Sequence, residues 1–505
     1  MNKTADRDGT ARRGSKNLLG LEQKNSDRAQ DQPSDRTRSR SLAEHEKNRG
    51  GAQPQATDGH EFKEEKLLLV LRFTLMISVL NGSVFNLVLP DIARTYRLAP
   101  SQVSWVAAGY MLVYAVGSVV YGKLADRWRL RSLLTFGLVF FAVGSSLGAA
   151  AQSFGMVVAA RVLQAAGSSV VPAAAMLVPV RFFPPERRGR ALASNAVGTA
   201  LGNAAGPVAA ALIAGFAGWR FLFLLALLAL IALPFLWRLL AHEPPLSGTP
   251  LDIAGALLLT GAALCLLLAV TRLDLPLAVM GIGLAALFVR RIRTARAPFV
   301  DPALFASRRY SLGLAIAFAA NGIGFSLPFL MPQLLAQVNG LASSRVGWVM
   351  LPGALTSVLL GRRGGRYADK HGTRALFRVA AALQAACCLL LSTYAGGPVL
   401  VVGLIYVAGY LGQTLMLVAL SGTVAADLRP EHAGVGMGFF SMLTFLSSAA
   451  TATVLGRLLD LSMNRAINPF QQHPAAYGFS NLFAGELVLL VAIIFAYSSL
   501  SRVRR

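Results

Sequence analysis

One charged side chain lies within an otherwise apolar stretch, and its position limits the chemistry it can do. Arg161 comes about six residues into an uncharged run that begins near residue 154, roughly 9 Å along a helix. Leaving an arginine in lipid at that depth costs about 3 kcal/mol, so we expect it to face a bundle interior or a wet cavity. The alternative is an arginine that extends to the outer surface.

Amide side chains in other apolar runs provide partners for such an arginine. Together they would form a neutral, hydrogen-bonding site suited to uncharged or zwitterionic amphiphiles. These residues are Asn81, Asn86, Gln164, Asn195, Asn203, Asn321, Gln333 and Gln413.

Two short segments place an aspartate among basic residues in nearly the same order. The first reads Gly-Lys-Leu-Ala-Asp-Arg-Trp-Arg-Leu-Arg from Gly122, and the second reads Gly-Arg-Tyr-Ala-Asp-Lys-His-Gly-Thr-Arg from Gly365. A carboxylate at a membrane edge can pair with an arginine and a facing helix end in one conformation and release them in another. The alternative is a basic loop that only sets orientation. The residues we assign to this gating loop and its repeat are Gly122, Asp126, Arg127, Arg131, Gly365, Asp369, Gly372 and Arg374.

Two further features concern packing and ionisation. Gly198, Gly202 and Gly206 recur every four residues and are followed by Pro207, which predicts a ridge for close helix contact and a kink.

Glu486 is the only acid that we find inside an apolar run, and an ionisable group there is a functional candidate. A glutamate that simply faces the lipid headgroups is the alternative.

Covalent catalysis finds no support in the sequence. The six histidines are scattered in loops or in the first segment, and no metal-ligand spacing, phosphate-binding glycine loop or nucleophile elbow stands in a suitable context. We therefore expect no enzymatic activity, no cofactor and no metal site.

The elements that must position these residues are membrane-spanning helices. Of 505 residues, 54% are hydrophobic and 14% are charged, whereas about a quarter would be charged in a soluble protein. The runs between charges are long enough to cross ~30 Å of hydrocarbon as helices, and they lack the alternation of a β-barrel. The fourteen expected spans are 67–90, 102–121, 132–151, 154–180, 190–214, 218–238, 251–271, 274–290, 311–333, 346–361, 375–394, 397–420, 434–456 and 480–500.

The net charge of +24 is explained by basic residues that lie beside the apolar runs, and it does not indicate nucleic-acid binding. Basic residues gather in alternate loops, as the positive-inside rule expects of cytoplasmic loops. Both termini are therefore expected in the cytoplasm of a bacterial cell. Cys265, Cys387 and Cys388 fall inside spans and predict no disulfide.

The domain organisation follows from composition and from the repeat. Residues 1–65 are polar and predict a disordered cytoplasmic tail. The two aspartate loops are eight spans apart, as expected for two six-helix halves separated by two extra helices, and such repeats are typical of secondary transporters. We expect the first bundle at 66–240, the extra helices at 241–300, and the second bundle with a short basic tail at 301–505.

Six segments carry a resemblance to a known family. The chain resembles the major facilitator superfamily, within it the fourteen-helix drug/proton antiporters, and most of all the tetracycline efflux proteins of Gram-positive bacteria. The matching segments are Asn86–Ala93, Val120–Asp126, Arg161–Gly167, Gly202–Pro207, Pro298–Pro302 and Ala433–Met437.

The resemblance implies roles for several residues. It gives Asp126 and Arg127 the part of a latch that holds the outward-open state, and it places Arg161 at a cavity that handles protons and substrate. It makes the ridge at Gly198, Gly202, Gly206 and Pro207 a pliable contact between the two halves. One departure is Arg129, which stands where the family has a second glycine; the repeat keeps Gly372.

Three helices lack an expected acid. The resemblance implies membrane-embedded carboxylates in the first, fifth and thirteenth helices, where this chain has Asn81, Asn203 and Ser447. Asn and Ser cannot gain and lose a charge, so the substrate and the coupling ion stay open.

Three functions fit the sequence. The first is a monomeric, proton-driven exporter of a drug or amphiphile, such as tetracycline, working by alternating access. The second is an uncoupled or differently coupled metabolite facilitator. The third is a membrane sensor or scaffold that transports nothing and uses its tail to hold a partner.

Overall fold

The computed structural model describes residues 55–125, 127–240, 252–295, 298–300, 302–428, 433–461 and 465–502. The chain divides into two units at Phe62 and Lys63, and the following description concerns the second unit. Residues 1–54, Asp126 and the last three residues lie outside the described residues, as does the side chain of Asp369. The predictions made for them stay predictions.

Helices make up nearly all of the described chain. The first group comprises α2 (Gln55–Tyr96), α3 (Pro100–Val103), α4 (Trp105–Leu124), α5 (Leu130–Ala149), α6 (Phe154–Ser168), α7 (Val170–Phe182), α8 (Pro185–Phe216), the 3₁₀ segment η1 (Trp219–Ala232) and α9 (Leu233–Leu239). Then come α10 (Ile253–Arg272) and α11 (Leu275–Thr294). The last group comprises η2 (Pro302–Ala306), α12 (Arg308–Gln337), α13 (Ser343–His371), α14 (Thr373–Tyr394), α15 (Val399–Ala425), α16 (Ala433–Asp460), η4 (Pro474–Ala476) and α17 (Tyr477–Arg502).

Thirteen helices in the described residues are long and apolar enough to cross a membrane. They coincide with thirteen of the fourteen expected spans. The remaining span, 346–361, lies within α13, which has 29 residues and is long enough to cross. Its apolar part is short because Arg345 and Arg363 lie near its two ends, and this lowers its mean hydropathy.

Local sequence explains where several helices start and stop. The carboxylates of Asp252 and Asp274 accept hydrogen bonds from backbone N–H groups in the first turns of α10 and α11. Ser307 caps α12 in the same way. Gly372 separates α13 from α14 with a φ of +83°, a conformation that favours glycine.

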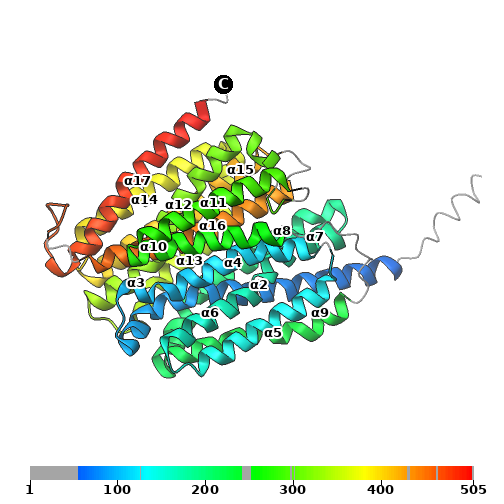
Figure 1. Cartoon of the computed structure of the whole chain (residues 1–505), viewed down its shortest axis with the longest axis horizontal. Coiled ribbons are helices and arrows are strands. Elements are labelled where there is room, and N and C mark those ends of the chain that lie inside the picture. Colours follow the sequence, from blue (N-terminus) through cyan, green and yellow to red (C-terminus); the bar gives the residue numbers. More distant parts are fainter. Residues whose placement is uncertain are drawn as a thin grey trace, which may run out of the picture. The chain divides into compact units, whose positions relative to one another are not determined.

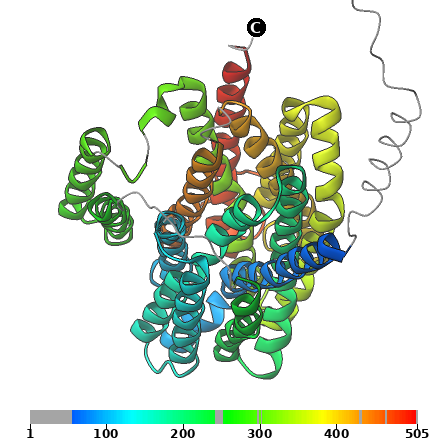
Figure 2. The ribbon, with the colours of Figure 1, turned by 90° about the vertical axis from the view of Figure 1, so that its right-hand side faces the viewer.

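The helices pack as two groups joined by a few pairs. Figure 1 shows them running side by side along a common direction. Within the first group α5 packs on α6 and η1; within the last group α14 packs on α15 and α17, and α12 on α15 and α16. The groups meet where α8 packs on α13 and α4 packs on α16. The hairpin of α10 and α11 touches α4 and α16 and stands to one side of the other helices in Figure 2.

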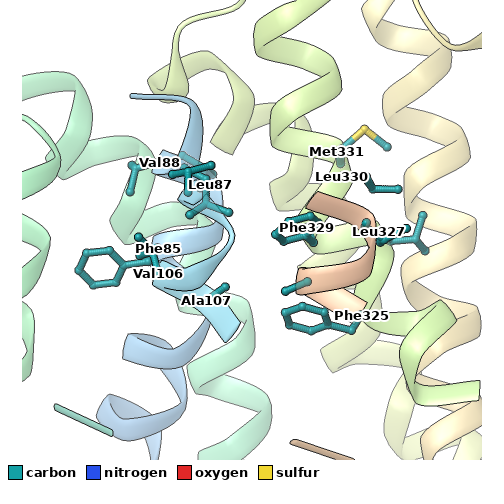
Figure 3. Close-up of a cluster of buried hydrophobic side chains, with 14 of the residues drawn as sticks. Phe85, Leu87, Val88, Val106, Ala107, Phe325, Leu327, Phe329, Leu330 and Met331 are labelled. Atoms are coloured by element: carbon teal, nitrogen blue, oxygen red, sulfur yellow. The ribbon is translucent and has the colours of Figure 1, made fainter. Parts of the chain in front are cut away.

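One buried apolar cluster extends across both groups. It includes Phe85 and Val88 of α2, Val106 of α4, and Phe325 and Phe329 of α12. In Figure 3 the labelled residues of α2 and α4 form one set and those of α12 form another. The interface between the groups is therefore lined mainly by apolar and aromatic side chains. A polar side chain buried among them is an exception that needs a hydrogen-bond partner or a function.

Candidate functional site

Arg161 of α6 is completely buried and hydrogen-bonded to neutral partners. Its Nε donates to the carbonyl of Val106 in α4 at 3.2 Å, and its Nη1 donates to the carbonyl of Asn81 in α2 at 3.2 Å. The same Nη1 also donates to the Gln164 side chain, 3.0 Å away. The guanidinium thus joins three helices, and an arginine that extends to the surface is excluded.

Two aromatic rings flank the Arg161 guanidinium. Its central carbon lies 3.9 Å from the ring centre of Tyr110 and 4.2 Å from that of Phe85. A desolvated cation over an aromatic ring gains roughly 2 kcal/mol, so the rings offset part of the cost of burying the charge. We define Arg161, Phe85 and Tyr110 as the arginine cluster.

Hydrogen bonds fix the orientation of the arginine cluster. Gln164 donates to Ser145 at 2.9 Å, which holds its oxygen toward Arg161. The Tyr110 hydroxyl lies 2.9 Å from that of Ser168, and the neighbouring Tyr114 hydroxyl lies 3.1 Å from that of Ser78. Positions on α2, α4, α5 and α6 are therefore tied together around one charge.

Several polar atoms beside the cluster are buried without a hydrogen-bond partner. They are Nη2 of Arg161, both amide atoms of Asn81, and Oδ1 of Asn86. A buried polar atom without a partner costs about 1–3 kcal/mol, so each would gain from a polar group of a bound solute or from water. The arrangement can recognise a solute that is flat or apolar on one side and hydrogen-bonding on the other.

The other expected amides divide into two sets. Asn195 donates to Ala175 O at 2.5 Å, Asn321 to Thr444 O at 2.7 Å and Gln333 to Phe329 O at 3.1 Å, so these three act within the helix packing. Gln413 keeps an unpartnered Oε1. Asn203 on α8 is half-buried, and no hydrogen bond joins it to the arginine cluster within the described part of the chain.

The glycine ridge contacts a helix of its own group. A Cβ on Gly198 would meet Arg72 O at 2.7 Å, one on Gly202 would meet Met76 O at 2.6 Å, and one on Gly206 would meet Ser83 Oγ at 2.4 Å. All three neighbours belong to α2, whereas the expected contact was between the two halves. Only Pro207 faces the other group, since its carbonyl lies beside Gly347 of α13. The ridge is therefore a close-packing surface for α2, and the opposite face of α8 meets α13.

The two aspartate loops differ in backbone conformation. Arg129 has a φ of −59°, which any residue can adopt, whereas the corresponding Gly372 has a φ of +83°. This explains why arginine is tolerated in the first copy. The guanidinium carbon of Arg131 lies 4.4 Å from the ring centre of Trp237, and Arg127 is exposed. A Cβ on Gly122 or Gly365 would meet no atom within 4 Å. Because Asp126 lies outside the described residues, the latch stays a prediction.

The segment after α11 lies against the first loop. Lys123 of α4 donates to the carbonyl of Pro298 and lies 5.5 Å from the Phe299 ring centre. Asp252 accepts from Phe299 N and from Arg291 Nε, each at 3.2 Å. Burial raises the pKa of Asp252, but the bonds from Gly255 N–H, Arg291 and Phe299 N–H outweigh it and hold that pKa below its usual value.

Glu486 is buried between helices and does not face the headgroups. Glu486, on α17, is 8% exposed, and Cys388 Sγ of α14 lies 4.0 Å from its Oε2.

A separate pocket of about 500 Å³ lies among α11, η2 and α16. Its lining includes Phe288, Arg293, Val300 and Phe439.

Sequence reasoning missed the aromatic and interface residues. The expected site did not include Tyr110, Phe85, or the rings of Tyr114 in α4 and Phe445 in α16, which contact each other. An aromatic residue in an apolar run carries no signal of its own. Tyr110 and Tyr114 are four residues apart on α4, a spacing that places them on one helix face. Asp91 of α2, which accepts a hydrogen bond from Ser343 of α13, was missed although it ends an apolar run.

The comparison with known families decides the class of protein. A model of the major facilitator superfamily matches residues 71–452. The chain belongs to the major facilitator superfamily. It is accordingly a multi-pass membrane protein and a secondary transporter, because the members of this superfamily move small molecules across membranes and are not enzymes.

Individual relatives of this major facilitator are distant. The riboflavin transporter RibZ of Clostridioides difficile (strain 630) is 27% identical over 419 residues, which cover 81% of this chain and 91% of RibZ. MdtD of Klebsiella pneumoniae (strain 342), a candidate multidrug resistance protein, is 26% identical over 444 residues, covering 85% of this chain and 93% of MdtD.

Solved structures share the fold alone. The inward-facing, unoccupied structure of a bacterial homologue of the human lysosomal transporter Spinster matches with a TM-score of 0.64 and 16% identity, over 90% of this chain and 98% of that one. A D-xylose–proton symporter matches with a TM-score of 0.61 and 13% identity, over 86% and 97%.

Proposed function

We propose that this transporter exports an amphiphilic, aromatic small molecule in exchange for protons, and that the solute binds beside the arginine cluster. The observation that carries this proposal is the set of unpartnered buried atoms on Arg161, Asn81 and Asn86 next to two aromatic rings. Aromatic rings favour a flat apolar face, and the free amide and guanidinium atoms favour carbonyl or hydroxyl groups. The site suits an uncharged or zwitterionic solute.

The relatives support the same solute class. RibZ is named for riboflavin, a flat heterocycle with many hydrogen-bonding groups, and MdtD is named for multidrug resistance. Tetracycline, also a polycyclic molecule rich in carbonyl and hydroxyl groups, stays a candidate solute on the resemblance of the sequence motifs. Its divalent-metal complex is cationic and would favour a carboxylate, which the arginine cluster lacks.

To describe alternating access we must first state which ends of the helices face the cytoplasm. We place both termini in the cytoplasm and the end of α2 at the outer side of the plasma membrane, because the basic loops lie at the opposite end. At the outer end Asp91 of α2 accepts from Ser343 of α13, and Asp460 of α16 accepts from Ser101 N of α3 at 3.1 Å. These contacts would hold the outer side closed, and the two halves (66–240 and 301–505) would rock about the arginine cluster, with the Asp126 and Asp369 loops as latches.

A facilitator without proton coupling is the second candidate. It is favoured by the chemistry around Arg161, where every hydrogen-bond partner is a neutral carbonyl or amide. Among the residues that the structure describes, no carboxylate is hydrogen-bonded to Arg161 and could exchange a proton there as the solute leaves. Counterflow that is unaffected when the proton gradient is collapsed would support this second function.

Growth of a pump-deficient bacterium tests the proposed solute class. Cells that express the full chain are exposed to tetracycline, ethidium and an aromatic zwitterion such as ciprofloxacin, and their riboflavin content and secretion are measured. We expect protection against at least one polycyclic compound or increased riboflavin secretion, and Arg161→Lys should remove the effect. Normal sensitivity to every compound together with unchanged riboflavin would contradict the proposal.

A further inference from the structure

The strongest unexplained feature is a carboxyl group buried in the last helix group. Glu486 lies about 14 Å along α17 from its first residue, within a span of 26 residues. It is 8% exposed, and no cation forms an ion pair with it among the described residues. Burying an ionised carboxylate without a paired charge is very unfavourable, so the group must be a neutral acid in this conformation.

The described neighbours of Glu486 can hold a neutral acid, and none of them supplies a positive charge for a carboxylate. The Ser326 hydroxyl of α12 lies beside the carboxyl group, and it also lies 2.7 Å from the Ile323 carbonyl oxygen, to which it can donate. A serine hydroxyl has one hydrogen and two lone pairs, so Ser326 can accept a hydrogen bond from the carboxylic acid while it donates to Ile323, or it can turn and donate to the carboxylate once the proton has left. The other contact is Cys388 Sγ at 4.0 Å, and a thiol is a weak donor.

In the part of the chain that the structure describes, the elements packed on α17 bring only thiols as further ionisable groups close to Glu486. α14 contributes the thiols of Cys387 and Cys388, and α12 contributes the Ser326 hydroxyl. For α16 and η4, which also pack on α17, the described residues include no charged side chain that interacts with it. A change in its surroundings when the helices move would thus directly change whether it holds a proton.

A second and independent observation is that unpartnered polar groups lie on the helices around Cys388, the residue beside Glu486. Gln384 is four residues before Cys388 on the same face of α14, is 1% exposed, and has no partner for either amide atom. It packs against Gly412 of α15, and the next residue, Gln413, keeps an unpartnered Oε1 beside Gly324 of α12. Free amide atoms of this kind can each bind water.

We propose that Glu486 binds and releases the proton that drives transport, and that Gln384 and Gln413 position the water that connects it with the interface of the two helix groups. The inference rests on the proposed proton-coupled export and assigns its missing acid. While Glu486 is buried it keeps its proton, and Ser326 accepts a hydrogen bond from the carboxylic O–H group. When the last helix group tilts and water reaches the carboxyl group, the O–H bond breaks, the proton leaves as hydronium, and the carboxylate remains hydrated until the next cycle.

Infrared spectroscopy of the purified full chain tests the neutral acid without any solute. The wild type should show a carbonyl stretch of a protonated, buried carboxylic acid at neutral pH. Glu486→Gln should remove that band, and the matched variant Asp274→Asn, which changes a helix cap outside the site, should keep it. An identical band in the wild type and in Glu486→Gln would overturn the inference.

Transport assays separate this inference from the proposed function. Vesicles containing the wild type, Glu486→Gln or Asp274→Asn are tested with riboflavin, tetracycline and ethidium for proton release and for counterflow at equal pH. We expect Glu486→Gln to lose proton release at least tenfold while counterflow stays within about twofold of the wild type, and Ser326→Ala to shift the pH dependence. Proton release that persists in Glu486→Gln would overturn this inference and leave the proposed function standing. If Glu486→Gln loses both proton release and counterflow, Glu486 has a structural role, and the inference is overturned too. A wild type that transports without releasing protons overturns the proposed coupling and the assignment together.

Discussion

The ring of Tyr114 in α4 meets the ring of Phe445 in α16 edge-on, with their centres 4.7 Å apart. Tyr114 also stacks on Tyr110, whose ring covers Arg161, so an aromatic series leads from the buried charge to the other helix group. A movement that separates α16 from α4 would break this edge contact. The pair therefore links the arginine cluster to the interface that alternating access would open.

Removing the Phe445 ring should weaken this link. Aromatic pairs contribute about 1 kcal/mol beyond their buried area, so Phe445→Ala should lower transport of an aromatic solute by roughly fivefold or more. Phe445→Leu keeps most of the volume without the ring and serves as the matched control. Initial transport rates in vesicles check this prediction: both variants should be slower than the wild type. A wild-type rate in Phe445→Leu beside a reduced rate in Phe445→Ala would show that volume matters and the ring does not.

Replacing Arg161 with lysine should impair solute binding although the charge is kept. Lysine cannot reach the carbonyls of Val106 and Asn81 and the Gln164 oxygen in the same geometry, and it covers the two rings less well. We expect affinity for the transported solute to fall at least tenfold, measured by equilibrium binding to purified protein. Arg345→Lys, near the start of α13, is the control. Similar affinities for the two variants would remove Arg161 from the site.

The contact between Asp91 and Ser343 should open and close during transport. Because the two side chains are hydrogen-bonded, a disulfide between Asp91→Cys and Ser343→Cys is expected to form on oxidation and to stop transport. Reduction should restore the activity, and each single variant should be insensitive to oxidant. Full transport by the cross-linked protein would mean that this end of the helices does not separate.

The acid stability of the α10–α11 hairpin should depend on Asp252. A carboxyl group whose pKa is lowered by folding stabilises the protein above its unfolded pKa, near 3.9, and this contribution is lost as the pH falls through the folded value. Arg291 is nearly half-exposed, so its pairing contributes only about 1 kcal/mol. Asp252→Asn should therefore unfold at a lower temperature than the wild type at pH 7. The difference should begin to shrink below about pH 3.9 and should vanish only once the pH has fallen through the lower pKa of the folded state. A difference that grows on acidification would contradict the assignment.

The glycine ridge should be intolerant of side chains. At Gly202 a Cβ would lie 2.6 Å from Met76 O and 2.9 Å from Val79 Cβ, so Gly202→Val should separate α8 from α2 and cost about 1–3 kcal/mol. Gly283 on α11 has open space around it and provides the control. Thermal unfolding in detergent measures both, and a neutral effect at Gly202 would be inconsistent with the close packing.

Much of the fold could be predicted because lipid imposes one rule on every span. An apolar run of about twenty residues must be helical, so the helices around Arg161 and Glu486 were located to within a few residues. The charge in an apolar run also led us to expect Arg161 inside the bundle or at a wet cavity with amide side chains as partners, and it is buried with a hydrogen bond to Gln164. The partners were harder to predict, since the approach of Tyr110 and Phe85 depends on helix rotation, which hydropathy does not encode. The same holds for Gly202, whose spacing predicted a close contact while its partner helix, α2, depended on the packing of the whole group.

Proton release on addition of the solute to energised inverted vesicles tests the central claim most directly. For the full wild-type chain, the account predicts that adding the solute identified in the growth test partly dissipates the imposed pH gradient, at a rate that saturates with solute concentration. Arg161→Lys should require a higher solute concentration, and Glu486→Gln should show almost no response. A gradient that stays unchanged while the labelled solute still crosses the membrane would contradict proton-coupled export and leave a facilitator in its place.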